Sequence, residues 1–470
     1  MKLNICFSFI FMSNSLKKNS LTLYNVVFQG VAGSAPAGAA VATLTGSAAF
    51  ALGSLPLSAV VAFIIVLINA IIINRISKHV VGAGGYYAYS REGLGYFAGI
   101  FTGWMYIMYQ IMSLAFIGLS VAIFLPALLD TIFGIVIPFY SWVFLLILIL
   151  GFGYFVSFSG VRNSVRYAMV MATIEVIIIA AISIIIITAK PSINTISVFT
   201  PVYATHGFTG VMLGVLFMYT AFSGFGTATP LGEEAQNANS AIGRGVLISV
   251  IILGLFFVLA SYAFTVGWGP SKMLSYSQEL VPGIILTKSY LGIAGAIVIT
   301  VLFVNSLFTD AVVFTNSLSR VVFSMSRDNI LPGILSSVHS KRRTPNVAAG
   351  MMVILAFAIG AISVVALGGF NAFLYTGIAA TLSALLVHMF ANASLAGILH
   401  KLKLKLNLAM DVALPIISIA ILAFVFYGSF VSIDRIVIIA SVTFIVWVII
   451  GLFYSAISRK YLKHVAINQN

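Results

Sequence analysis

The stretch Gly30-Val31-Ala32-Gly33-Ser34-Ala35-Pro36-Ala37-Gly38 interrupts an apolar segment at the depth where a membrane helix should be continuous. A second apolar segment is interrupted in the same way at Ser223-Gly224-Phe225-Gly226. Backbone amides and carbonyls freed inside a bilayer cost on the order of several kcal/mol each unless protein, water or a ligand satisfies them. A matched pair of interrupted helices is typical of the binding site of a transporter, so we expect a small polar solute to bind here.

The composition is that of a polytopic membrane protein. Of the 470 residues, 61% are hydrophobic and 7% are charged, whereas soluble domains carry about 25% charged residues. Apolar stretches long enough to cross about 30 Å of hydrocarbon recur along the chain. We count about twelve, at residues 22–46, 55–76, 94–125, 138–159, 165–189, 207–230, 245–268, 284–317, 345–367, 370–399, 412–431 and 434–457.

The net charge of +14 is distributed so that it orients the chain in a membrane. If the amino terminus is cytoplasmic, twenty basic residues lie inside and four, Lys190, Lys272, Lys288 and Arg435, lie outside. This positive-inside bias predicts a multi-pass protein of the cell membrane with both termini in the cytoplasm. The basic excess is explained by the lipid bilayer, so no nucleic-acid partner is expected.

We expect a single transmembrane domain over residues 21–460, with cytoplasmic tails at residues 1–20 and 461–470. The stretch from Met1 to Met12 weakly imitates a signal peptide, and we expect either that Met12 is the true start or that the stretch is a loose tail. Cys6 is the only cysteine, which excludes an internal disulfide and a cysteine-rich metal site. No metal, cofactor or ATP-binding loop is expected.

The two interruptions fall in the first and the sixth segment. Because their places differ by five, an odd number, the sixth segment must cross in the direction opposite to the first. The fold class that we predict is therefore all-α, with two inverted repeats of five helices, discontinuous helices 1 and 6, and two additional C-terminal helices.

Four short stretches resemble amino acid permeases of the amino acid, polyamine and organocation superfamily. They are Gly82-Ala83-Gly84-Gly85-Tyr86-Tyr87-Ala88-Tyr89 before the third segment, Gly33-Ser34-Ala35 in the first, Phe222-Ser223-Gly224-Phe225 with Glu233-Glu234-Ala235-Gln236-Asn237 after the sixth, and Ser319-Arg320 with Ser326-Arg327-Asp328-Asn329-Ile330-Leu331-Pro332 after the eighth. The resemblance covers roughly residues 20–460. It implies a secondary transporter, not an enzyme.

Three positions depart from the pattern of that superfamily. Its Gly-Ser-Gly turn ends here in Ala35, and the Asn-Pro that usually follows the paired glutamates reads Asn237-Ala238. The bulky aromatic residue that gates the substrate in several relatives falls at Thr220, with Tyr219 and Phe222 beside it. We therefore expect a looser gate, or one built from a neighbouring residue.

The two interruptions have opposite electrostatic preferences. A half-helix that begins after Gly33 exposes amides and a positive dipole end, which suit a carboxylate, and we expect Ser34 and Ala35 to be the donors. Pro36 fits the first turn of such a helix. A half-helix that ends at Ser223 exposes carbonyls, which suit an ammonium group; the candidates belong to residues 221–223, followed by Gly224 and Phe225. The alternative is that these small residues only allow close helix packing.

Three ionisable side chains are predicted deep in the membrane: Glu175, Asp310 and His388. Such residues usually face a cavity. Glu175 falls near the position where some proton-coupled members of the resembling superfamily carry a lysine, so we expect it to bind the coupling proton. Asp310 could complete a cation site or contact a basic substrate. The alternative for both acids is a protonated or paired carboxyl that holds helices together, and for His388 we expect an ordinary core hydrogen bond.

Glu233 and Glu234, which follow the sixth segment, are candidates for an inner gate through pairs with Arg75, Arg162 or Arg166; the alternative is a solvated loop.

Our main hypothesis is amino acid transport by alternating access, driven by protons or by exchange. Transport of a polyamine or another organic cation is the alternative within transporters. An ion channel is the alternative from another class, although the sequence offers no repeated filter.

Overall fold

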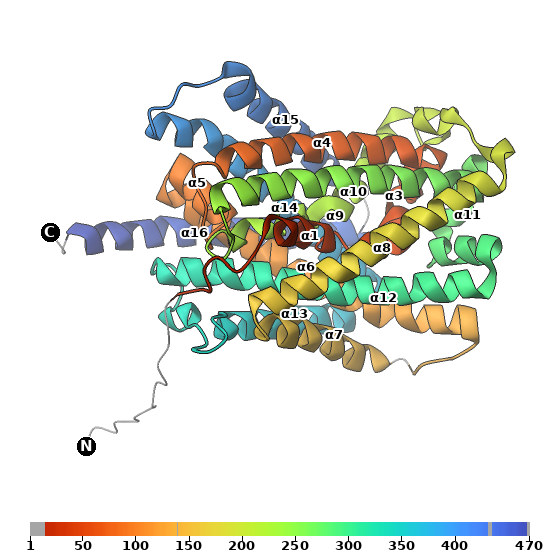
Figure 1. Ribbon diagram of the computed structural model, residues 1–470, viewed down its shortest axis with the longest axis horizontal. Coiled ribbons are helices and arrows are strands. Elements are labelled where there is room, and N and C mark those ends of the chain that lie inside the picture. The colour runs from red at the N-terminus through yellow and green to blue at the C-terminus, as the bar shows by residue number, and fades with distance from the viewer. Residues whose placement is uncertain (1–14, 139, 431–434, 468–470) are drawn as a thin grey trace.

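A computed structural model describes residues 15–138, 140–430 and 435–467 of the chain. The expected start at Met12 and the signal-like stretch before it lie outside these residues. The described chain forms one bundle of long helices (Figure 1). Its described beginning and the end of the last helix lie at the same end of the bundle, which we call the terminal end; the opposite end is the distal end.

Eleven helical stretches of the described residues are long and apolar enough to cross a membrane. The first of them, Leu23–Ile76, contains two crossings, because the chain turns at Leu52–Ser54, where Leu52 has a φ of 46°. The bundle therefore has twelve crossings within the described residues, as the sequence predicts.

The first crossing is built from short pieces. It comprises α1 (Leu23–Ala32), α2 (Pro36–Gly38), the π-helical turn η1 (Ala39–Thr43) and α3 (Leu44–Ala51). The side chain of Thr22 caps α1 by accepting from the Asn25 amide, which fixes where this helix begins. The sixth crossing consists of α9 (Phe208–Phe222) and the 3₁₀ segment η6 (Ser223–Leu231).

The first and sixth crossings run in opposite directions. At the terminal end, Leu21 before α1 pairs with Ala235 after η6. At the other end, the Thr205 amide before α9 donates to the carbonyl of Phe50 near the end of α3, at 3.1 Å. The beginning of each crossing thus lies beside the end of the other, as the predicted inverted repeat requires.

The remaining helices of the two repeats complete the bundle. They are α4 (Leu55–Ile76), α5 (Tyr86–Leu94), α6 (Tyr96–Phe133), α7 (Ser141–Phe158), α8 (Val161–Ala189), α10 (Ala238–Trp268), α11 (Met273–Gln278), α12 (Pro282–Arg327), α13 (Asn346–Leu367) and α14 (Gly369–Lys401). Short 3₁₀ turns join them: η3 (Pro191–Ile193), η4 (Ile196–Phe199), η5 (Pro201–Tyr203), η7 (Pro270–Lys272) and η8 (Gly333–Ser336). The third and eighth crossings extend well beyond their expected ends, and α12 bends at Gly292, whose φ is 65°.

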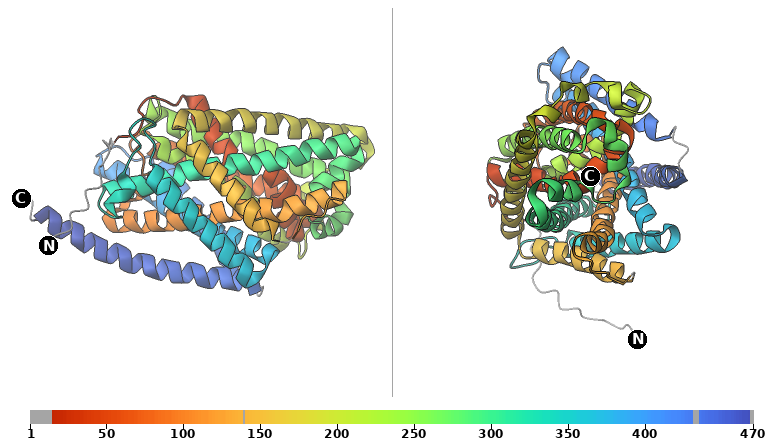
Figure 2. Two further views of the ribbon diagram at one scale, coloured as in Figure 1. Left: turned by 90° about the horizontal axis from the view of Figure 1, so that it is seen from below. Right: turned by 90° about the vertical axis from the view of Figure 1, so that its right-hand side faces the viewer.

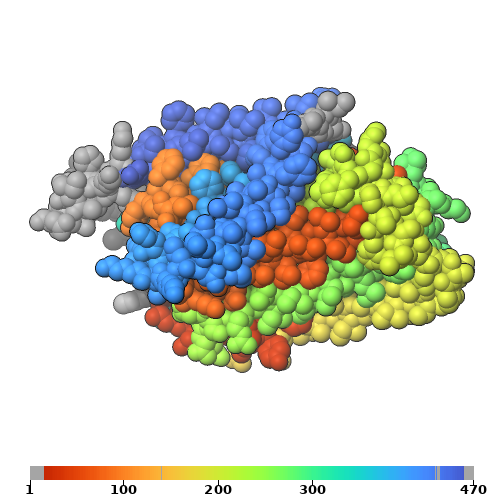
Figure 3. Space-filling view, turned by 90° about the horizontal axis from the view of Figure 1, so that it is seen from above, coloured from red at the N-terminus to blue at the C-terminus, as the bar shows by residue number. Residues whose placement is uncertain are grey.

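Two further crossings follow the repeats and lie on the outside. They are η9 (Leu408–Ala413) with α15 (Leu414–Phe430), and α16 (Arg435–Ile467). Figure 3 shows α15 crossing the face of α4, and Figure 2 shows α16 along the edge of the bundle. These helices expose large apolar side chains such as Phe424 and Phe453, as expected for surfaces that face lipid. Because α16 continues to Ile467, residues 461–467 are helical.

Candidate functional site

The two interrupted helices touch at their glycines. A methyl group added at Gly224 would lie 1.5 Å from the carbonyl oxygen of Gly33, so the two backbones are in direct contact. A methyl group at Gly33 would lie 2.8 Å from the side chains of both Thr227 and Val313. Glycine is therefore required at both positions by the close approach of the two interruptions.

The interruption in the first crossing changes the direction of the chain within three residues. Ala35 has a φ of 41° and a ψ of 68°, the left-handed conformation, and Pro36 occupies the first position of the next helical piece. The amides of Ser34 and Ala35, which we predicted as free donors, donate here to the carbonyls of Val31 and Ala32 at 3.1 and 3.0 Å. In this conformation both amides form hydrogen bonds at the end of α1. An anion could therefore bind these amides only if those hydrogen bonds break.

Carbonyl groups at the end of α9 face side-chain hydroxyls. The Ser34 hydroxyl donates to the carbonyl of Phe222 and to that of Gly30, both at 3.4 Å. The hydroxyl of Tyr109 on α6 donates to the carbonyl of Ser223. The end of the helix is thus satisfied by polar groups that a ligand could displace.

A cavity of about 40 Å³ lies between the two interruptions. Seven residues of the predicted site line it, and α6, α12 and α14 supply much of the rest of its wall. The predicted residues in the wall are Gly33, Ser34, Ala35, Thr220, Ala221, Ser223 and Asp310. Phe222, Gly224 and Phe225 do not: Phe222 and Phe225 are buried, with ring centroids 5.0 Å from Phe257 and 5.1 Å from His388 respectively.

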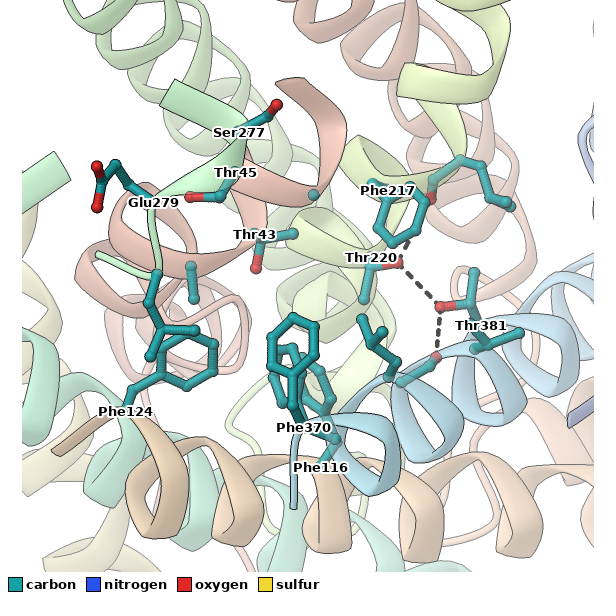
Figure 4. A pocket seen from close by; sticks show the side chains of 18 of the residues that line it. Thr43, Thr45, Phe116, Phe124, Phe217, Thr220, Ser277, Glu279, Phe370 and Thr381 are labelled. Atoms are coloured by element: carbon teal, nitrogen blue, oxygen red, sulfur yellow. Dashed lines mark hydrogen bonds between the residues drawn. The ribbon is translucent and has the colours of Figure 1, made fainter. Parts of the chain in front are cut away.

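A larger cavity of about 270 Å³ adjoins the first on its distal side (Figure 4). It is bounded by residues 277–280 at the end of α11 and just after it, and by Phe370 near the beginning of α14. Thr220 lines both cavities, and its hydroxyl is 2.9 Å from that of Thr381. Phe116, which stacks on Phe373 at 4.6 Å, lies beside this pair. The expected looser gate is consistent with a threonine pair flanked by aromatic rings from other helices.

The terminal side of the central cavity is closed by packed aromatic rings and by ion pairs. Glu234 and Arg320 form a bidentate pair at 2.5 and 3.1 Å in which neither side chain is exposed. Glu233 pairs with Arg327 at 2.5 Å near the surface. The expected partners Arg75, Arg162 and Arg166 are therefore wrong: Arg75 pairs with Asp411, and arginines of α12 bind both glutamates. Sequence spacing could not reveal that α12 continues to this depth.

A surface pair binds α5 to α14 at the terminal end. Lys401 donates to Glu92 at 2.7 Å, and Arg91 also contacts this carboxylate at 3.3 Å. Partial burial raises the pKa of Glu92, but Lys401 and Arg91 together outweigh that effect and leave the pKa below its ordinary value. Both side chains of the Lys401 pair are partly exposed, so this pair contributes under about 1 kcal/mol.

Glu175 joins α8 to the first and eighth crossings. Its carboxylate accepts from the amide of Ala37 at 3.4 Å, from the Ser306 hydroxyl at 2.6 Å and from the Asn305 amide at 2.8 Å. The residue is 1% exposed and does not line the central cavity. Its carboxylate therefore contacts the beginning of the helical piece after the interruption.

His388 and Tyr219 lie on the terminal side of the central cavity. The Tyr219 hydroxyl is 2.5 Å from Nδ1 of His388, so the expected core hydrogen bond of this histidine is confirmed. The imidazole ring also packs against Tyr86, Tyr109 and Phe225. This aromatic cluster separates the cavity from the terminal end.

The chain matches the amino acid permease family over residues 25–466. It belongs to that family. Its membership confirms that this permease is a transporter and not an enzyme, with an amino acid or a polyamine as the class of solute.

Characterised relatives of this permease carry different solutes. It is 24% identical to the branched-chain amino acid permease BcaP of Bacillus subtilis, with 70% of this chain and 72% of that protein aligned. It is 22% identical to the low-affinity putrescine importer PlaP of Escherichia coli K12, with 73% of each chain aligned. The crystal structure of MhsT in complex with L-phenylalanine matches it with a TM-score of 0.59 at 14% identity, covering 86% of this chain and 98% of that one. This match shows the fold.

Several lining residues of the permease were not predicted. Tyr109 and Phe116 come from α6, Thr381 comes from α14, and Asn305 and Ser306 hold Glu175. Tyr109 and Ser113, four residues apart in α6, are a sequence signal for that wall, but α6 also carries Thr102, Tyr106 and Gln110. The spacing therefore does not tell which side chains of α6 face the interruptions.

Proposed function

We propose that this permease transports an α-amino acid by alternating access, with the substrate bound between the two interruptions. The observation that carries the proposal is that one cavity is lined both by the turn before α2 and by the end of α9. A helical piece that begins at a cavity favours an anion, and one that ends there favours a cation. A zwitterion satisfies both without any charged side chain.

The carboxylate would bind at Gly33, Ser34 and Ala35. Ser34 lines the cavity and its hydroxyl donates to the carbonyl of Phe222, so a rotation of the side chain would bring this donor to a ligand oxygen. The amides of Ser34 and Ala35 become available as their bonds within the turn lengthen. Hydrogen bonds to a charged group contribute about 1.5 to 3 kcal/mol, more than the neutral bonds that they replace.

The ammonium group would bind the carbonyls of Ala221, Phe222 and Ser223. In this conformation the Tyr109 hydroxyl donates a hydrogen bond to the Ser223 carbonyl. An ammonium group has three donors and can replace the hydroxyl there. A cavity of about 40 Å³ is smaller than an amino acid, so binding must also expand it toward the adjoining distal cavity.

Transport requires that access alternate between the two ends. Of the two adjoining cavities, the larger lies on the distal side, and the pair of Glu234 and Arg320 helps to separate both from the pocket of about 380 Å³ at the terminal end. If the termini are cytoplasmic, as the positive-inside bias predicts, this conformation faces outward. Glu175 is our candidate for the proton-coupling residue, since its carboxylate accepts from the Ala37 amide at the beginning of the piece that must move.

A binding screen of the purified protein tests the proposal. Thermal shift is measured against the proteinogenic amino acids and against polyamines, with and without sodium and at two pH values. We expect at least one α-amino acid to stabilise the protein and to drive counterflow in proteoliposomes. If polyamines bind and every zwitterion is ignored, the organic-cation alternative replaces the proposal, and single-channel currents would instead indicate a channel.

A further inference from the structure

Asp310 lines the central cavity without a partner of its own. The residue is 7% exposed, and its Oδ1 is buried and makes no hydrogen bond. No hydrogen bond or ion pair of either carboxylate oxygen occurs in the part of the chain that the structure describes. By contrast, both oxygens of Glu175, the other deep acid of this region, are hydrogen-bonded.

The wall of the cavity offers this carboxylate no compensating charge. Among the described residues, Asp310 is the only ionisable acid in the wall, and the wall contains no lysine, arginine or histidine. A buried carboxylate without a partner is unfavourable, because nothing compensates for its lost hydration.

We propose that Asp310 is a specificity residue that binds a second cationic group on the substrate. The permease would then favour an α-amino acid whose side chain ends in an amine or guanidinium group. The inference rests on the function proposed above, in which the two interruptions bind the α-carboxylate and the α-ammonium group of the substrate. The inference adds which class of substrate side chain is preferred, because the backbone groups at the interruptions do not select among side chains.

The arrangement along α12 supports this assignment. Asp310 lies one turn after Ser306 and one turn before Phe314, so all three share one face of the helix. Leu307 and Phe314 line the cavity beside Asp310, and Ile117 of α6 lines it as well. Apolar walls that lead to one carboxylate suit a methylene chain that carries a terminal cation.

Competition measurements on the intact protein test the inference. Counterflow or binding is measured for lysine, ornithine and arginine, for the uncharged norleucine, and for the diamine putrescine. The comparison is made in wild type, Asp310→Asn and Asp310→Glu. Asp130→Asn is the matched control, since Asp130 is an exposed acid at the end of α6, away from the cavity.

We expect wild type and Asp130→Asn to prefer lysine or ornithine to norleucine by at least tenfold. Asp310→Asn should lose that preference through weaker binding of the cationic substrates while norleucine binds as well or better, and Asp310→Glu should retain part of it. The wild-type ratio is itself a test, and it does not depend on the folding of any variant.

The outcomes separate the inference from the function on which it rests. Wild type that binds norleucine at least as well as lysine overturns the role of Asp310 and leaves amino acid transport standing. Putrescine binding that depends on Asp310, without binding of any amino acid, supports the cationic subsite and overturns amino acid transport. Binding of neutral amino acids that requires sodium and is lost in Asp310→Asn would make Asp310 a coupling-ion ligand and would overturn the inference.

Discussion

At the scale of single residues, two polar side chains form hydrogen bonds at the first interruption. Ser34 bridges the two broken helices through its hydroxyl, and Glu175 accepts from the amide of Ala37 just beyond the turn. Ser34 could be predicted from the sequence because it lies in the interruption. The contacts of Glu175 could not, because they depend on the rotation of α8 against α12.

Replacing Ser34 with alanine should weaken substrate binding about tenfold, because a hydrogen bond to the substrate carboxylate is lost. The measurement is the dissociation constant of the best ligand found in the binding screen. Ser120→Ala is the matched control: its hydroxyl also belongs to the cavity wall but donates to the carbonyl of Phe116 in its own helix. Equal affinities in the two variants would contradict the role of Ser34.

Replacing Glu175 with glutamine should abolish the stimulation of uptake by an inward proton gradient. The amide keeps an acceptor for the Ala37 amide but can no longer bind and release a proton, so counterflow at equal pH on both sides should persist. The measurement is uptake into proteoliposomes across a series of external pH values. Undiminished uptake that still follows the pH gradient would rule out Glu175 as the coupling residue.

At the scale of elements, the contact between the first and sixth crossings depends on glycine. Gly224 touches the backbone of Gly33, whereas Gly151 in α7 has open space around its Cα. The sequence marks Gly224 as part of the second interruption, but it does not show which backbone lies against either glycine. Only the packing of η6 against α1 makes one of them necessary.

Gly224→Ala should destabilise the protein by at least about 1 to 3 kcal/mol and abolish transport, because backbone atoms cannot move aside as a flexible side chain would. Gly151→Ala should leave both properties within about 1 kcal/mol of wild type, since alanine is also the better helix former. The apparent melting temperature in detergent and counterflow activity measure the difference. A Gly224→Ala protein that melts and transports normally would show that the two backbones are not in contact.

At the scale of the whole molecule, access is controlled from opposite ends by different interactions. The larger of the two adjoining cavities lies on the distal side, and aromatic packing and the pair of Glu234 and Arg320 separate both cavities from the terminal end. Removing one partner of a buried pair leaves the other charge uncompensated, at a cost of about 3 to 5 kcal/mol. That cost falls on the conformation closed at the terminal end, in which the pair exists.

Glu234→Gln should therefore shift the protein toward the conformation that is open at the terminal end. Cysteine labelling in a Cys6→Ser background measures the shift, because Cys6 is the only native cysteine. Thr45→Cys reports on the distal cavity and Thr227→Cys on the buried contact between α1 and η6. We expect Glu234→Gln to raise the labelling rate at residue 227 and to lower it at residue 45.

The more exposed pair supplies the control for this experiment. Glu233→Gln removes a neighbouring charge whose partner Arg327 is 41% exposed, so the labelling rates should change little. If Glu233→Gln and Glu234→Gln shift the two rates equally, the buried pair does not control access. If neither variant shifts them, closure of the terminal end rests on aromatic packing alone.

The sequence by itself determined the class of fold, the number of crossings and the positions of the two interruptions. These properties follow from local composition, because only helices satisfy the backbone within a bilayer and only small or cyclic residues tolerate such breaks. The tertiary structure decided the partners of Glu175, Glu233 and Glu234, the walls supplied by α6 and α14, and the isolation of Asp310. These features depend on how each helix is rotated and how far it extends, and a uniformly apolar helix carries little local signal for either property.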